Sequence, residues 1–224
     1  MRITFSFIAL LLLLFSVPAL AADPLAAKLQ KKYASINTMQ SAFTQVLVHK
    51  ESGSRQNRSG TFSFKKPLLV RWDTQSPSKE LLLVSANVVW NAFPDEEIAY
   101  KYALSLAQDS RSIIRVMTGQ ARLDQDFVVE NEGKEGNLLL LRLYPKDPTQ
   151  ALVEALLWID ADTLLIKKVR VYDFYGNENE IAFDKQNING NLNDALFSYT
   201  PPKDYAVEDM TKKGAAKPKN PLMQ

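Results

Sequence analysis

Short stretches in which apolar and polar residues alternate, separated by turn residues, recur along most of the chain. Phe62 and Phe64 alternate with Thr61 and Ser63, which is the period of a half-buried β-strand. Pro67 follows in a turn, because proline lacks a backbone donor and is excluded from central strands. The same pattern predicts strands at residues 44–49, 58–64, 68–72, 79–84, 88–93, 127–132, 137–144, 152–159, 164–172 and 178–186. The short connections favour an antiparallel meander of about ten strands.

Two segments carry a helical period instead. Asp23-Pro24 is typical of an N-cap followed by proline in the first turn, and it predicts a helix over residues 24–43 or a shorter one broken near Asn37. A second helix is predicted over residues 104–119, with Gly119 as its C-terminal cap. Its apolar face consists of Leu106, Ile113, Ile114 and Met117.

Three predicted strands are apolar on both faces, at residues 81–84, 138–141 and 156–159. A half-solvated sheet alternates instead, so something must cover the second face of these strands. Two explanations stay open: helices packed over an ordinary core, or an apolar cavity that the helices close as a lid. A long antiparallel series that curves into a barrel-like sheet would enclose such a concave face.

The first residues have the features of a secretory signal peptide. Arg2 precedes an apolar run from Ile3 to Val17, and Ala19-Leu20-Ala21 is an A-x-A cleavage site. The run of about 15 residues is shorter than the ~20 that a spanning helix needs, so we expect cleavage after Ala21 rather than an uncleaved anchor. We expect residues 22–210 to form one domain and the Lys-, Ala- and Pro-rich residues 211–224 to be a disordered tail.

Composition excludes several classes of function. The net charge of +2 argues against a nucleic-acid-binding protein. The chain has no cysteine and a single histidine, His49, and it lacks a Gly-x-Ser-x-Gly motif, which argues against thiol enzymes, zinc sites and serine hydrolases. The carboxylates of Asp95-Glu96-Glu97 follow Pro94 and are typical of a solvated turn rather than a glycosidase site. We therefore expect no enzymatic activity, no cofactor and no metal.

In their order along the chain, several motifs resemble those of a known family. They are Ser41-Ala42-Phe43-Thr44-Gln45 at the end of the first predicted helix, Gly60-Thr61-Phe62 before Lys65-Lys66-Pro67 and Arg71-Trp72, Pro77 before Leu81-Leu82-Leu83-Val84-Ser85, Val89-Trp90 with Pro94, and Phe197-Ser198-Tyr199-Thr200-Pro201-Pro202 before Val207 and Asp209. Over residues 25–209 the chain resembles the periplasmic outer-membrane lipoprotein carrier proteins, the LolA family.

The resemblance implies a mainly β fold with some α: an incomplete, unclosed antiparallel β-barrel of about ten or eleven strands, with an α-helical lid over an apolar cavity. It implies a periplasmic chaperone that receives acylated lipoproteins from an inner-membrane ATP-driven lipoprotein-releasing complex and delivers them to an outer-membrane receptor. Exposing an acyl chain of about fifteen carbons to water costs roughly 10 kcal/mol, at ~0.8 kcal/mol per methylene, so such cargo needs shelter. We expect a monomer.

Two other functions remain open. Lipid-sensing periplasmic regulatory modules of envelope-stress signalling share a similar half-barrel, although they generally carry a second domain for which we expect no room after Asp209. A carrier of another lipid would use the same cavity physics. Sequence alone does not separate these two functions from a lipoprotein carrier.

The resemblance also suggests which residues bind lipid. We assign the concave wall to Phe62, Phe64, Leu69, Trp72, Leu81, Leu83, Trp90 and Trp158, and the lid face to Ile113, Ile114 and Met117. Ordinary core packing explains each of these residues equally well when it is taken alone.

Two departures from the family pattern concern turns. Enteric members carry an arginine just before the hairpin proline, understood to tie barrel to lid, where this chain has Lys66. Lysine keeps the positive charge but lacks the planar guanidinium group with its several donors, so we expect it to hold the lid to the barrel more weakly. The short turn at Ala86-Asn87 puts the hairpin near Trp90 in question.

Overall fold

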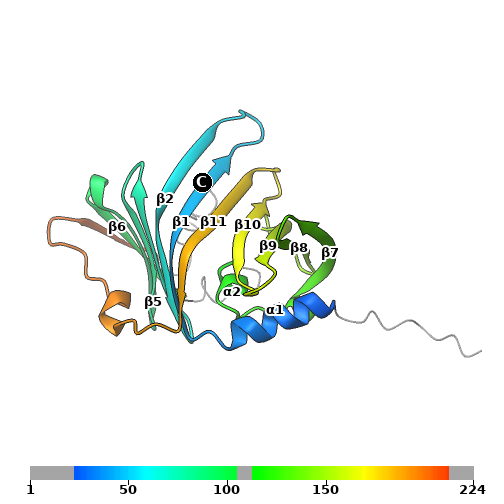
Figure 1. Ribbon diagram of the computed structural model, residues 1–224. Helices are drawn as coiled ribbons and strands as arrows, with labels where there is room; N and C mark the ends of the chain where they lie inside the picture. Colours follow the sequence, from blue (N-terminus) through cyan, green and yellow to red (C-terminus); the bar gives the residue numbers. More distant parts are fainter. Residues whose placement is uncertain (1–22, 105–112, 212–224) are drawn as a thin grey trace, which may run out of the picture.

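The computed structural model shows a strongly curved sheet with short helices packed against one of its faces (Figure 1). It describes residues 23–104 and 113–211. The strands of these residues form one sheet of twelve, in the order β12 (Ala206–Asp209), β6 (Ile98–Ala103), β5 (Val88–Phe93), β4 (Glu80–Val84), β3 (Leu69–Ser76), β2 (Arg55–Lys65), β1 (Thr38–Val48), β11 (Glu178–Ile188), β10 (Ile166–Tyr172), β9 (Glu154–Asp160), β8 (Leu138–Pro145) and β7 (Phe127–Glu135). The helices are α1 (Pro24–Ala34), α2 (Ile113–Met117) and α3 (Leu123–Asp126), with the 3₁₀ turns η1 (Pro94–Glu96) and η3 (Asp194–Phe197).

Neighbouring strands pair antiparallel except for β12, which runs parallel to β6. The edge strands β12 and β7 do not pair with each other, so the sheet is unclosed. The expected incomplete antiparallel barrel is therefore confirmed. The described residues contain more strands than the ten or eleven expected.

The longer form of the first predicted helix, over residues 24–43, is wrong, whereas the shorter form that breaks near Asn37 agrees with α1. α1 ends at Ala34, and residues 38–48 form β1 instead, so the motif at residues 41–45 lies in a strand and not in a helix. The start of α1 agrees with the prediction, because the Asp23 carboxylate accepts a hydrogen bond of 2.7 Å from the Leu25 amide. Buried residues of β1 alternate as Met39, Ser41, Phe43, Gln45 and Leu47. Because Ser41 and Gln45 are polar, the apolar residues alone do not show the period of a strand. Phe43 then falls at a helical spacing from the apolar residues that precede it.

The strands β6 and β12 were missed. β6 follows the exposed turn at residues 95–97, and its alternation over six residues is weak. All four residues of β12 are exposed, so no apolar pattern marks them; the strand exists because its backbone pairs with β6. The other strands agree with the predicted ones apart from shifts at their ends. The hairpin in question near Trp90 does form, with Leu83 opposite Trp90.

We call the face of the sheet that packs against α1, α2 and α3 the inner face, and the opposite one the outer face. One large apolar cluster fills the space between the inner face and the helices. A second, smaller cluster lies on the outer face, where Leu81, Leu83 and Trp90 pack against Tyr199 and Tyr205 from the segment before β12. The apolar residues 81–84 are thus covered on one face by the main cluster and on the other by the C-terminal segment.

Other predictions fall partly outside the described residues. The predicted signal peptide lies outside them, as does the predicted tail apart from Thr211 and the part of the second helix at residues 105–112. The described end of that helix agrees with the prediction, since α2 is followed by Gly119 with a positive φ of 72°. Within residues 23–104 and 113–211, none of the helices has the length and hydropathy to cross a bilayer.

Candidate functional site

Aromatic rings dominate the centre of the inner face. The ring centroid of Phe62 lies 5.0 Å from that of Trp72 and 5.8 Å from that of Phe183, and Phe43 lies 4.8 Å from Trp72. All four residues belong to the main cluster, and Phe62 is 0% exposed. Rings at these separations also gain from edge-to-face contact, beyond the area they bury. We call this group, together with Phe64, the aromatic layer.

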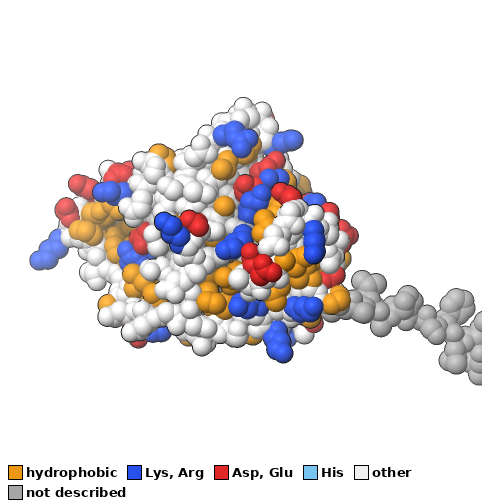
Figure 2. Space-filling view, in the orientation of Figure 1, with side chains coloured by type: hydrophobic (Ala, Val, Ile, Leu, Met, Phe, Trp, Pro, Cys, Tyr) orange, Lys and Arg blue, Asp and Glu red, His pale blue; other side chains and the backbone are white. Residues whose placement is uncertain are grey.

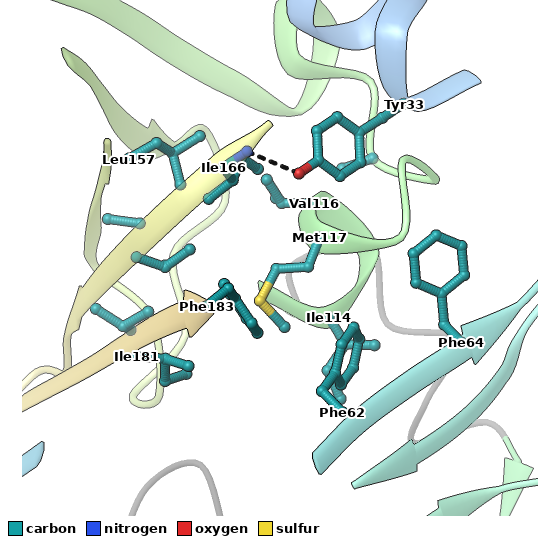
Figure 3. Packing of buried hydrophobic residues seen from close by; sticks show 14 of the residues in the cluster. Tyr33, Phe62, Phe64, Ile114, Val116, Met117, Leu157, Ile166, Ile181 and Phe183 are labelled. Carbon is teal, nitrogen blue, oxygen red and sulfur yellow. Dashed lines mark hydrogen bonds between the residues drawn. The ribbon is translucent and has the colours of Figure 1, made fainter. Parts of the chain in front are cut away.

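The helices supply the other side of this cluster. Ile114 and Met117 of α2 point toward Phe62 and Phe183, as Figure 3 shows, and Met117 is 1% exposed. The Tyr33 hydroxyl of α1 accepts a hydrogen bond of 2.9 Å from the Ile166 amide. Burial raises the pKa of the Tyr33 hydroxyl. Both helices therefore contact the strands across one closed apolar interior.

The structure brings together five of the predicted lipid-binding residues. Phe62, Phe64 and Trp72 of the sheet and Ile114 and Met117 of α2 lie in the main cluster. Ile113, the remaining residue assigned to the lid face, begins α2. The structure places these five residues between sheet and helices, and lipid contact by each of them stays a prediction.

The assignment of Leu81, Leu83 and Trp90 to the concave wall is wrong. In the pairing of β3 with β4, Trp72 stands opposite Leu82, so Leu82 and Val84 face inward. The three predicted residues alternate with these and lie on the outer face. Four consecutive apolar residues carry no period, so register with the neighbouring strand decides which pair faces the interior.

The assignments of Leu69 and Trp158 are also wrong, for the same reason of alternation. Leu69 is half-buried and precedes the inward Val70. Trp158 lies between the inward Leu157 and Ile159, so its ring faces outward, 3.8 Å from the Lys168 ammonium, and its indole N–H donates to the Glu135 carboxylate at 2.9 Å. The Lys168 ammonium over its ring and the hydrogen bond from its indole nitrogen stabilise this tryptophan in a buried position on the outer face.

Charged side chains of both signs are interspersed over the visible surface, as Figure 2 shows. The carboxylates at residues 95–97 are exposed, as expected for a solvated turn, and His49 is exposed at the end of β1. Within the described part of the chain, no group of three or more His, Asp or Glu side chains is placed to hold a metal ion.

Lys66 joins the sheet to α1. Its ammonium donates hydrogen bonds to the carbonyl oxygens of Tyr33 at 3.0 Å and Ala34 at 2.6 Å. Carbonyls in the last turn of a helix have no partner within the helix, and a cation there also interacts favourably with the helix dipole. Desolvation lowers the pKa of Lys66. The basic residue before the hairpin proline thus contacts a helix through backbone carbonyls.

Toward the strand ends farther from α1, the inner face becomes polar. Adjacent strands contribute one polar residue each at this level: Asn179 from β11, Gln45 from β1, Arg58 from β2, Thr74 from β3 and Glu80 from β4. We call these residues the polar row. Each of them is at most 9% exposed.

The polar row is connected by side-chain hydrogen bonds. The Arg58 guanidinium forms an ion pair with the Glu80 carboxylate and donates to the Thr74 hydroxyl at 3.5 Å. The Gln45 amide donates to Asn179 Oδ1 at 3.0 Å, whereas Gln45 Oε1 is buried with no hydrogen-bond partner. Sequence reasoning missed this row, although Arg58 has the same strand parity as Phe62 and Glu80 the same parity as Leu82.

A hollow of about 230 Å³ lies beyond the polar row, among the ends of β1, β2, β10 and β11, which point away from α1 in Figure 1. Leu47, Val171 and Asn179 line it from the inner face, and His49, Ser54 and Gln56 also line it. Asn179 therefore belongs both to the polar row and to this hollow.

Comparison with known proteins identifies the family. A family model described as "Outer membrane lipoprotein carrier protein LolA" matches residues 34–200, which is more than half of the chain. The chain therefore belongs to the LolA family. It is similar to the outer-membrane lipoprotein carrier protein of Methylococcus capsulatus, with 27% identity over 75% of this chain and 79% of that protein. The carrier protein of Chromobacterium violaceum is 24% identical over 79% of this chain and 84% of that protein.

Solved structures show the same fold at low sequence identity. An uncharacterised conserved protein from Thermus thermophilus matches with a TM-score of 0.53 and 12% identity, covering 82% of this chain and 96% of that protein. The lipoprotein LppX from Mycobacterium tuberculosis matches with a TM-score of 0.50 and 13% identity, covering 77% of this chain and 99% of that protein. At this identity, both likenesses concern the fold alone.

Proposed function

We propose that this protein is a periplasmic chaperone for acylated lipoproteins. It takes them from an inner-membrane ATP-driven releasing complex, shelters their acyl chains, and delivers them to an outer-membrane receptor. The observation that carries this proposal is the aromatic layer, an apolar interior between sheet and helices in a chain of the LolA family. A carrier of this kind needs no catalytic group, since its work is the exchange of one apolar environment for another.

The apolar interior between the sheet and the helices is closed in this structure. Phe62, Phe64 and Met117 are at most 1% exposed, so acyl chains can enter only when the helices and the sheet move apart. Hydrogen bonds that oppose this movement are those of Lys66 to the end of α1 and of the Ile166 amide to Tyr33. Bound acyl chains would replace the contacts that the helices now make with the aromatic layer. The aromatic layer would then stay buried, so much of the free energy lost when the helices move away would be regained.

A release assay tests the proposal. The chain from residue 22 to 224 is added to spheroplasts that synthesise a labelled outer-membrane lipoprotein, and soluble complexes are separated by size. We expect a one-to-one complex of carrier and lipoprotein. If the chain binds an apolar fluorescent probe but takes up no lipoprotein, the cargo is a different lipid and the proposal fails.

Paired variants at Met117 provide the control. Met117→Leu keeps the volume and apolar character of the side chain, so we expect uptake close to that of the wild type. Met117→Glu places a carboxylate against the aromatic layer, and we expect uptake to be lost. Uptake at the wild-type level by the glutamate variant would remove α2 from the lipid-binding surface.

A further inference from the structure

We propose that the polar row is a subsite for the polar linkage of an acylated ligand, meaning the ester or amide groups that join its acyl chains to a head group. This inference rests on the proposed function, because it assumes that the acyl chains lie against the aromatic layer. It assigns a ligand contact to Gln45, Arg58 and Asn179, none of which belongs to the apolar interior.

Strand register places the polar row next to the aromatic layer. Gln45 is the next inward residue after Phe43 in β1, and Arg58 stands opposite Gln45 on β2. Thr74 follows the inward Trp72 in β3. An acyl chain that lies along the aromatic layer with its polar end away from α1 therefore brings that end to the polar row.

The chemistry of the row suits ester and amide groups. Gln45 Oε1 is a buried acceptor with no partner, and such a group costs free energy until a donor reaches it. An amide N–H or a glycerol hydroxyl is such a donor. Arg58 carries N–H donors, and the carbonyl oxygen of an ester or amide accepts hydrogen bonds. The row thus offers acceptor and donor to a linkage that contains both.

Stability alone does not account for the row. A buried ion pair such as Arg58 with Glu80 is often no more stabilising than apolar residues of similar volume, because both charges lose their hydration. The neighbouring inward positions Phe62, Trp72 and Leu82 are apolar, so an apolar residue would fit the same layer. A polar ligand group gives the buried charges and amides a function.

The hollow beside Asn179 supports this position. Its volume of about 230 Å³ lies below the roughly 300–1,000 Å³ of pockets that hold drug-sized ligands, so it has room for a small polar group. The hollow is lined by apolar Leu47 and Val171 and by polar side chains, including Asn179 and Gln56. A linkage bound at the row would direct its head group into this hollow.

The test compares two ligands that differ in the linkage. Diphenylhexatriene, a hydrocarbon, reports on the apolar interior alone, and 1-palmitoylglycerol carries an ester and two hydroxyls and is measured by displacement of the hydrocarbon. The variant Arg58→Met/Glu80→Met removes both charges together and leaves no unpaired buried charge. We expect it to weaken 1-palmitoylglycerol binding about tenfold, while the affinity for diphenylhexatriene changes less than about twofold.

A matched control removes an ion pair from the outer face. Arg142→Met/Glu154→Met should leave both affinities unchanged, because Arg142 and Glu154 alternate with the inward Leu143 and Ala155. Gln45→Met gives a second reading if the charge-pair variant does not fold, and we expect the same selective loss. Equal loss of both ligands, or no loss, overturns the subsite. Wild-type protein that binds neither ligand overturns the proposed function as well, whereas binding of the hydrocarbon without selectivity overturns the subsite alone.

Discussion

The Lys66 ammonium lies 2.6 Å from the carbonyl oxygen of Ala34, so the turn between β2 and β3 is hydrogen-bonded to the last residue of α1. The Lys66 backbone amide also donates to the Asn37 carbonyl at 2.8 Å. The backbone bond holds the turn against the start of β1, and the side-chain bonds hold the helix. The side chain can therefore release α1 without disturbing the turn.

Replacing Lys66 should change ligand exchange more than folding. For Lys66→Leu we expect a loss of about 1 kcal/mol in the free energy of unfolding and a several-fold faster release of bound diphenylhexatriene, because the α1 carbonyls lose their donors. Lys66→Arg should release the probe more slowly than the wild type, since the guanidinium fork has more donors. Stopped-flow fluorescence measures both rates.

Lys65 provides the control for these variants. Its ammonium pairs with the Asp194 carboxylate at 2.5 Å, away from α1, so Lys65→Leu should leave the release rate unchanged. A release rate in Lys66→Leu equal to that of the wild type would show that Lys66 is an ordinary turn residue.

Trp72 and Trp90 should respond differently to the same replacement. Trp72 lies in the aromatic layer and Trp90 packs 5.7 Å from Tyr199 on the outer face. We expect Trp72→Leu to lose about 2 kcal/mol of stability or more, by the usual cost of truncating a buried aromatic side chain, and Trp90→Leu to lose less, because Trp90 is only half-buried. Only Trp72→Leu should weaken diphenylhexatriene binding. Fluorescence titration at matched folded fractions checks this, and equal weakening by both variants would contradict the division into inner and outer faces.

Gly60 should tolerate no side chain. A Cβ at this position would lie 1.8 Å from the Asp73 carbonyl oxygen on β3 and 3.0 Å from the Phe43 ring. Because one obstacle is backbone, we expect Gly60→Ala to cost about 3 kcal/mol in urea unfolding. A Cβ at Gly133 would have nothing within 4 Å, but the residue has a φ of +84°. For Gly133→Ala we therefore expect a loss of about 1 kcal/mol in the free energy of unfolding, from backbone strain alone. Similar losses in both variants would mean that β2 and β3 can separate at Gly60 without penalty.

Tyr33 should make stability depend on alkaline pH. Burial raises the pKa of its hydroxyl, so the folded protein keeps this proton at a pH where the unfolded chain, with an ordinary pKa of ~10, has lost it. The unfolded state then binds fewer protons, and the free energy of unfolding falls as pH rises above ~10. In Tyr33→Phe this contribution is absent, so its stability should fall less steeply.

The same variant has an effect at neutral pH. The Ile166 amide loses its acceptor in Tyr33→Phe, which we expect to cost about 1–3 kcal/mol at pH ~7. Urea unfolding at a series of pH values measures both effects. If the curves of the two proteins stay parallel above pH ~10, Tyr33 titrates in the folded state as it does in the unfolded one.

Most strands could be predicted from the sequence because their apolar residues recur at every second position between turn residues, as Phe62 and Phe64 do. The prediction failed where that signal is absent or false. The inward residues of β1 include Ser41 and Gln45, and β12 is exposed throughout, so neither strand has the expected apolar pattern. The contact of Lys66 with a helix was expected from the resemblance to the LolA family and not from a pattern in the sequence, and the helix it contacts is α1, not the α2 segment assigned to the lid face.

The sequence by itself determined the kind of fold and the large apolar side chains available for an interior. Tertiary structure alone decided which of those side chains face that interior. Alternation along a strand shows which residues share a face, but not which face is the inner one, and a shift of one residue in the pairing exchanges the two faces. Leu82 rather than Leu83 faces inward because Leu82 pairs with the inward Trp72. The polar row depends on tertiary structure in the same way, since its five residues come from five strands and meet only when those strands pair.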